Sequence, residues 1–172
     1  INKDRLTIKG GEIKNNTAVS KGGAIYSYDT SELTIEGGTI SGNSAGSNGG
    51  AVNAIDTILK VSGGTFSANT TDEFGGAIYT ENTVATIKDG TFTNNSAKYG
   101  GAVCAYTSST TTVSGGTFNS NTATGSRGND FYVGGSKTEV PTLTLVGGEM
   151  DEVGAQYGLV QLGGSVKIKD KV

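Results

Sequence analysis

Short apolar segments separated by turn residues recur along the chain at an interval of about 26 residues. Each interval holds three such segments, as at 33–35 (LTI), 39–41 (TIS) and 51–53 (AVN), with Gly, Asn and Ser between them. Segments of this kind are typical of short β-strands bounded by turns, and none has helical spacing over a helical length. The pattern therefore predicts an all-β repeat.

Three markers share this interval. A doubled glycine or Asp-Gly pair follows the first strand of each unit, at 10–11, 37–38, 63–64, 89–90 and 115–116. Gly-Gly-Ala recurs at 22–24, 49–51, 75–77 and 100–102, and an apolar residue stands three positions before an asparagine in each unit. Three strands and three turns in roughly 26 residues predict one coil of a parallel β-helix, with coils stacked about 4.8 Å apart. We expect a solenoid of about six such coils.

Alignment of the units predicts which side chains fill the solenoid. The inward columns are Leu6, Leu33, Leu59, Ala85, Thr111 and Leu143; Ile8, Ile35, Val61, Ile87, Val113 and Leu145; Ile13, Ile40, Phe66, Phe92, Phe118 and Met150; and Ile25, Val52, Ile78, Val103 and Phe131. An asparagine column follows the second strand: Asn16, Asn43, Asn69, Asn95 and Asn121. Stacked amides can hydrogen-bond from coil to coil, so we expect this column to be structural rather than a ligand site.

The repeat predicts one β-helix domain over residues 1–172. Regular coils cover 5–133, an inserted loop with the only proline covers 134–141, and a degenerate terminal coil covers 142–172. The first and last residues suggest a fragment of a longer surface protein. Because loops on a solenoid often carry contacts, Lys137 and Glu139 are candidate binding residues.

The charge and composition of the chain limit the classes of partner that it is expected to bind. The net charge is only −3 and the basic residues are scattered, which argues against nucleic acid and anionic membranes. No apolar stretch approaches the roughly 20 residues of a membrane span, so no insertion is expected within this chain. The single cysteine, Cys104, excludes an internal disulfide framework.

Gly-Gly-Ala-Ile or Gly-Gly-Ala-Val at 22–25, 49–52, 75–78 and 100–103, paired with Phe-x-x-Asn at 66–69, 92–95 and 118–121, resembles a known repeat. It is similar to that of polymorphic outer-membrane autotransporter adhesins and other adhesin-like β-helices of bacterial and archaeal surface proteins, in the pectate-lyase-like superfamily. The resemblance covers about residues 5–133, although Ile13 and Ile40 stand where the motif has Phe. It implies a right-handed helix, an extracellular or cell-surface location and an adhesive role. We therefore expect a non-catalytic module that binds a glycan or protein partner or acts as a display stalk.

Alternation along the third strand places a second set of side chains outward. This set gathers five of the seven tyrosines on one face: Tyr26, Tyr28, Tyr79, Tyr106 and Tyr132. Tyrosine offers a flat apolar ring with a polar tip, which suits a host or matrix glycan or protein. The alternative is that these rings cover the sheet or pack under a neighbouring domain; Cys104, on the same face, is then a packed hydrophobe rather than a partly exposed thiol.

Other functions remain as alternatives. A β-helix polysaccharide lyase or hydrolase needs clustered carboxylates, often with Ca²⁺. The best acidic column contains Asp29 and Asp56, which are equally suited to backbone turns, so we expect no metal and no catalysis. Outward pairs such as Thr39/Ser41 and Thr65/Ser67 also resemble the ice-binding surfaces of some antifreeze solenoids, although Thr is simply a good exposed strand residue.

Overall fold

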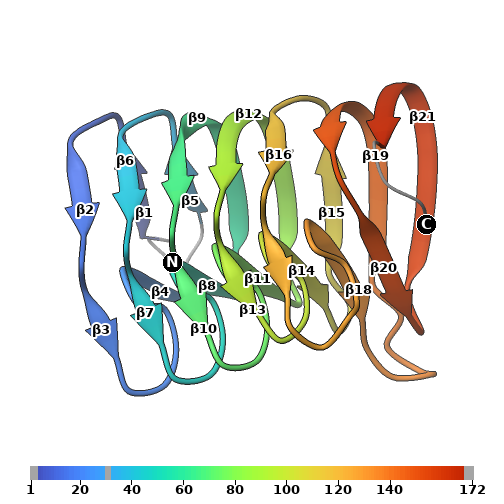
Figure 1. Cartoon of the computed structure of the whole chain (residues 1–172), viewed down its shortest axis with the longest axis horizontal. Coiled ribbons are helices and arrows are strands. Elements are labelled where there is room, and N and C mark those ends of the chain that lie inside the picture. Colours follow the sequence, from blue (N-terminus) through green and yellow to red (C-terminus); the bar gives the residue numbers. More distant parts are fainter. Residues whose placement is uncertain (1–3, 30–31, 169–172) are drawn as a thin grey trace.

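The computed structural model describes residues 4–29 and 32–168, and within these ranges the chain forms a parallel β-solenoid of about six coils without a helix (Figure 1). The long sheet holds β1 (Arg5–Ile8), β2 (Glu12–Lys14), β5 (Glu32–Ile35), β6 (Thr39–Ser41), β9 (Ile58–Ser67), β12 (Val84–Thr93), β15 (Thr110–Val113), β16 (Thr117–Asn119), β19 (Thr142–Met150) and β21 (Leu159–Ile168).

Two further sheets complete each coil. The narrow sheet holds the two-residue strands β3 (Thr17–Ala18), β7 (Ser44–Ala45), β10 (Thr70–Thr71), β13 (Ser96–Ala97) and β17 (Thr122–Ala123). The third sheet holds β4 (Ile25–Tyr28), β8 (Val52–Ile55), β11 (Ile78–Glu81), β14 (Val103–Tyr106), β18 (Phe131–Gly134) and β20 (Val153–Gln156). Every ladder between coils is parallel, as the repeat predicts.

The doubled glycine marks a bend in the long sheet. In β12 the pairing register to β9 shifts on both sides of Asp89, and the following Gly90 has a φ of 137°. Its counterpart Gly64 has a φ of 99°, a conformation that favours glycine. The strand therefore turns a corner without ending, so that its first half lies at the back in Figure 1 and its second half at the front.

The predicted inward columns form one continuous core. From the second coil onward the aligned residues are buried and pair in register, as Leu33 with Leu59 and Phe66 with Phe92. Coil 1 is the exception, since Leu6 is 50% exposed and Ile8 and Ile13 are only partly buried. These three side chains lie in the first coil of the described stack, and none of the described residues forms a coil on their other side.

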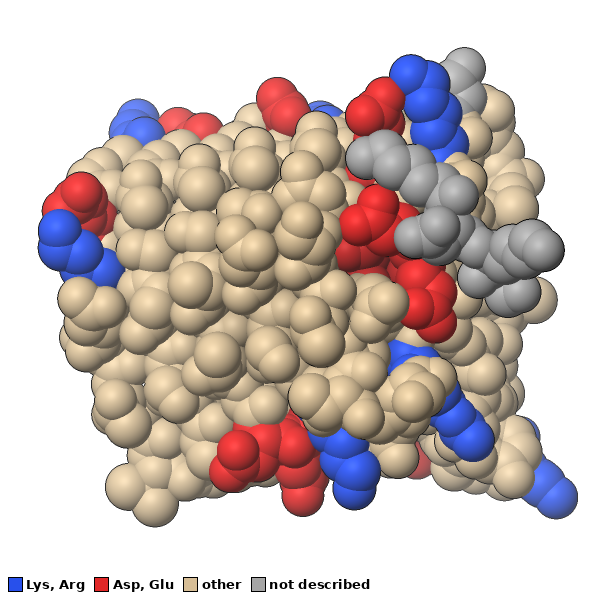
Figure 2. Space-filling model, viewed as in Figure 1, with Lys and Arg blue, Asp and Glu red and all other residues tan. Residues whose placement is uncertain are grey.

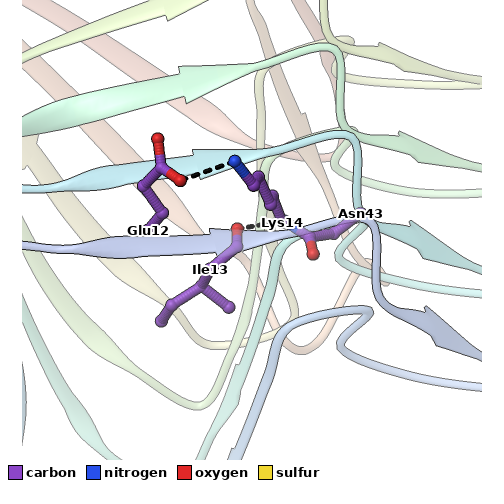
Figure 3. Close-up of polar contacts among 4 residues, drawn as sticks. All are labelled: Glu12, Ile13, Lys14 and Asn43. Carbon is purple, nitrogen blue, oxygen red and sulfur yellow. Dashed lines mark hydrogen bonds and ion pairs between the residues drawn. The ribbon is translucent and has the colours of Figure 1, made fainter.

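The asparagine column forms a hydrogen-bonded ladder inside the corner between the long and narrow sheets. The Oδ1 atom of Asn43 accepts from the backbone N and from Nδ2 of Asn16, both at 3.0 Å. Asn43 Nδ2 donates to the Ile13 carbonyl, as Figure 3 shows. The same pattern repeats through Asn69, Asn95 and Asn121, which are all buried. The prediction of a structural role for this column is confirmed.

The second glycine of Gly-Gly-Ala marks the closest approach between coils. A Cβ atom built on Gly50 would lie 2.1 Å from the carbonyl oxygen of Gly76, and one on Gly76 would lie 2.1 Å from that of Gly101. Both obstacles are backbone atoms, which cannot turn aside. This corner therefore requires glycine for steric reasons in each coil.

The final coil is shorter than the others. Leu33 pairs with Leu59 at the regular interval, but Leu143 pairs with Val160, only 17 positions later. The narrow sheet ends at β17, and β19 passes almost directly into β20 through Asp151 and Glu152. The terminal coil predicted over 142–172 is thus irregular in its described part, and it narrows because it lacks one of its three sides.

Candidate ligand-binding face

The outer face of the third sheet carries aromatic side chains on several coils. At its N-terminal end, Tyr26 and Tyr28 are 53% and 57% exposed, and their rings stack with centroids 6.2 Å apart and planes inclined by 20°. Both side chains point away from the core, while the alternate residues Ile25 and Ser27 are buried. We call these two residues the tyrosine pair.

Farther along the same face, five rings form what we call the aromatic cluster: Phe74, Tyr79, Tyr99, Tyr106 and Tyr132. Phe74 lies at the centre, with its ring centroid 5.2 Å from that of Tyr106 and 5.4 Å from that of Tyr99. Tyr99 in turn stacks on Tyr132 at 5.2 Å. The cluster also encloses Cys104 and is separate from the core inside the solenoid.

The expectation that the tyrosines form one exposed face is wrong for part of the set. Tyr79 and Tyr132 are 2% and 5% exposed, and Cys104 is fully buried, whereas Tyr106 is half-buried. Tyr79 and Tyr132 do point away from the core, as strand alternation predicts, but the rings of Phe74 and Tyr99 cover them. Cys104 is accordingly a packed hydrophobe rather than an exposed thiol.

Phe74 and Tyr99 are the residues that sequence reasoning missed. Each stands directly before a Gly-Gly-Ala corner. Isolated parallel bridges link this position from coil to coil, pairing Lys21 with Asn48, Asn48 with Phe74, and Phe74 with Tyr99. The sequence did contain a sign of this covering layer, because the same position holds a lysine and an asparagine in the first two coils and an aromatic residue in each of the next two. The exposed side of the column also carries charge, since Lys98 Nζ lies 5.5 Å from the centre of the Tyr99 ring.

Burial changes the chemistry of the covered groups. It raises the pKa of the Tyr79 and Tyr132 phenols, and it raises the pKa of the Cys104 thiol well above its ordinary value. The Tyr79 hydroxyl donates to Glu81 Oε2 at 3.1 Å, and the Tyr132 hydroxyl donates to Gln156 Oε1 at 3.3 Å. The two phenols thus remain neutral and hydrogen-bonded, which favours a role in packing.

Two amides lie on the coil between the tyrosine pair and the aromatic cluster. Asn53 is fully buried and pairs in register with Tyr26 on one side and Tyr79 on the other. Its Nδ2 donates to the Asn48 carbonyl at 3.3 Å, but the Oδ1 atoms of Asn53 and Asn48 are buried without a hydrogen-bond partner. Two acceptors are therefore left unsatisfied, at a cost of about 1–3 kcal/mol each.

The acidic column has a structural explanation. Asp29 and Asp56 are exposed and have φ values of 49° and 51°, and the aligned Asn82 has a φ of 47°. Asp and Asn tolerate this left-handed conformation better than other side chains with a Cβ. Among the described residues, no three or more His, Cys, Asp or Glu side chains gather as a group that could hold a metal ion.

The inserted loop is ordered by its own polar contacts. Ser136 Oγ accepts from the backbone N–H groups of Thr138 and Glu139, at 3.3 and 3.1 Å, while Pro141 is buried at the end of the loop. Lys137 and Glu139 are exposed at its tip. Their role in binding stays a prediction.

Asp130 ends the asparagine ladder. Its Oδ1 accepts from Asn121 Nδ2 at 2.7 Å, and its Oδ2 accepts from the backbone N–H groups of Asp151 and Glu152. Burial raises the pKa of this carboxyl above its usual 3.8, against the opposing effect of these hydrogen bonds. An acid replaces the next amide here because the short terminal coil lacks the corresponding turn.

This carboxyl predicts a pH-dependent contribution to stability. Because its pKa is higher in the folded chain than in the unfolded chain, folding takes up a proton, and the contribution falls as pH rises from 3.8 through the folded-state pKa. We expect Asp130→Asn to abolish this part of the pH dependence, as measured by urea unfolding over a pH series. Equal slopes for the wild type and the variant would contradict the assignment.

The described part contains no helix long and apolar enough to cross a membrane. No curated protein and no solved structure gives a significant match to the sequence. A family model described as "Right handed beta helix region" matches residues 1–143, which include the regular coils. The chain therefore belongs to the right-handed β-helix family.

Proposed function

We propose that this chain is a non-catalytic binding module of a bacterial extracellular or cell-surface protein, and that it holds a glycan against the outer face of its third sheet. The observation that carries the proposal is the tyrosine pair, two stacked rings that are each more than half exposed. A tyrosine ring presents an apolar face and a polar edge, which matches the alternating C–H and hydroxyl surfaces of a sugar. No cofactor is required.

Neighbouring groups extend this surface in a direction that suits a polymer. Phe74, Tyr99 and Tyr106 are partly exposed on later coils of the same face. Between them and the tyrosine pair lies the half-buried Asn48, whose unpaired amide oxygen would accept from a sugar hydroxyl if the side chain turned outward. A chain of sugar units running along the solenoid axis would contact rings and this amide in turn.

The proposed module is non-catalytic, which is supported by the structural or ion-pairing roles of six acidic residues. Asp29 and Asp56 occupy left-handed turns, and Asp130 closes the asparagine ladder. Glu12, Glu32 and Glu149 form ion pairs with lysines at 2.6, 2.6 and 2.7 Å. These arrangements use the carboxylates for structure and surface charge.

The test is binding to a glycan array, with host and matrix proteins printed alongside. We expect a glycan ligand whose affinity falls about tenfold or more in the Tyr26→Ala/Tyr28→Ala variant, since about 1.4 kcal/mol corresponds to a factor of ten. The matched control is Tyr157→Ala, because Tyr157 is 51% exposed but follows β20, at the opposite end of the third sheet from the tyrosine pair.

Two results would contradict the proposal. One is a folded protein that binds no glycan, which would favour a passive stalk. The other is an affinity that is unchanged in the double variant. Tyr79→Ala and Tyr132→Ala are less informative, since both residues are buried and their truncation would disturb packing.

A further inference from the structure

A second surface of the molecule carries hydroxyl groups in a regular array. It spans the second half of the long sheet and the adjoining narrow sheet over four successive coils, with three outward positions in each coil. Eleven of these twelve positions carry Thr or Ser, and the exception is Asn119. We call all twelve positions the hydroxyl face: Thr39, Ser41, Ser44, Thr65, Ser67, Thr70, Thr91, Thr93, Ser96, Thr117, Asn119 and Thr122.

The side chains of this face are held in register by the backbone. Thr39 pairs with Thr65, Thr65 with Thr91, and Thr91 with Thr117. The narrow sheet continues the pattern, since Ser44 pairs with Thr70 and Thr70 with Ser96. Neighbouring parallel strands lie about 4.8 Å apart, so each column repeats at that spacing. The closeness of the rows is evident where Thr70 Oγ1 donates to Ser44 Oγ at 3.4 Å.

The inner side of the array is rigid. Between the outward Thr and Ser positions stand the inward Phe66, Phe92 and Phe118, stacked with centroids 4.6 Å apart and planes within 9°. Beside them runs the buried asparagine ladder. A surface supported in this way loses little further conformational entropy when it binds a solid ligand.

The hydroxyl face is also uncharged. Figure 2 shows a broad area without Lys, Arg, Asp or Glu across the front of the molecule, with acidic side chains gathered beyond it toward the C-terminal coils. At the N-terminal end it is bounded by the Glu12–Lys14 ion pair. A charged side chain binds its hydration water strongly, and an ordered layer of water on the surface would have to replace that hydration water. The face contains no aromatic residue of the kind that sugars stack on.

We propose that the hydroxyl face binds ice. Each hydroxyl is both a donor and an acceptor, so it can join a water lattice in either role. The rows repeat at the strand spacing, which is close to the repeat of water molecules along one axis of hexagonal ice. The face is independent of the tyrosine pair and of the glycan proposal, since it lies on different sheets.

The experiment measures thermal hysteresis and the shape of single ice crystals in solutions of the purified chain. We expect a gap between melting and freezing temperatures, with faceted crystals, for the wild type. Thr91→Tyr, which puts a bulky ring in the middle of the array, should lose most of this hysteresis. The matched control is Thr86→Tyr in the same strand β12, before the glycine bend and therefore on the back face.

Circular dichroism melts of all three proteins establish that they are folded. Loss of hysteresis in Thr91→Tyr with retention in Thr86→Tyr supports the proposal. A folded wild type without hysteresis overturns it, and so does an equal loss in both variants. Adsorption to an insoluble polysaccharide without hysteresis, reversed by Thr91→Tyr, also overturns it and assigns this face to a polymer instead.

Discussion

Replacing Asn69 by alanine is expected to lower the free energy of unfolding by about 3 kcal/mol, because at least two buried polar groups lose their partners at about 1–3 kcal/mol each. The Asn69 Oδ1 atom accepts from the backbone N and Nδ2 of Asn43, and its Nδ2 donates to the Ile40 carbonyl and to Asn95 Oδ1. All of these bonds are 2.9–3.0 Å long and buried. Urea unfolding followed by circular dichroism measures the change.

The same column supplies the control. Asn16 is exposed, and its side chain makes one described bond, from Nδ2 to Asn43 Oδ1. Asn16→Ala should therefore cost less than about 1 kcal/mol, the net contribution of a typical hydrogen bond. If the two substitutions cost the same, the ladder does not stabilise the solenoid in the way that its geometry indicates.

The second large effect is expected for Phe92→Ala, at about 3–5 kcal/mol for a buried phenylalanine that leaves a cavity. The Phe92 ring is fully buried and stacks between Phe66 and Phe118, with both centroids 4.6 Å away. Its loss removes contacts on two sides at once. Denaturant unfolding gives the overall change, and hydrogen exchange gives its location.

The location is part of the prediction. Since each coil contacts only its neighbours, amide protection should fall most in β9, β12 and β16 and least in β1 and β2. Phe92→Leu, which keeps an apolar side chain, should cost clearly less than Phe92→Ala. Uniform loss of protection along the whole chain would show that the solenoid unfolds as a single unit.

The interior could be predicted from the sequence because each inward column takes one position from every unit. Leu33, Ile40 and Val52 identify three such columns within a single coil, and the structure buries all of them. The asparagine ladder was predictable for the same reason. A regular interval thus gives the interior of a solenoid almost directly.

The outer face was less predictable, since burial there depends on side chains from loops. Tyr79 and Tyr132 point away from the core as alternation requires, yet Phe74 and Tyr99 cover them from outside the strand. The ladder's last partner, Asp130, lies nine residues from Asn121 and directly precedes Phe131, where the earlier coils carry the alanine of Gly-Gly-Ala. Departures from the repeat carry information that the repeat itself cannot supply.

The separation of 26 residues between successive ladder partners from Asn43 to Asn121 also bears on how such a chain changes in length. Removal or duplication of 26 consecutive residues inside the regular coils would join equivalent positions, so that every column would continue in register. Recombination between repeats in the gene would then yield longer or shorter rods that still fold. Each event would add or remove one complete row of residues from every surface. Selection could thus change the length of the solenoid and the number of repeated binding positions while the contacts between coils stay the same.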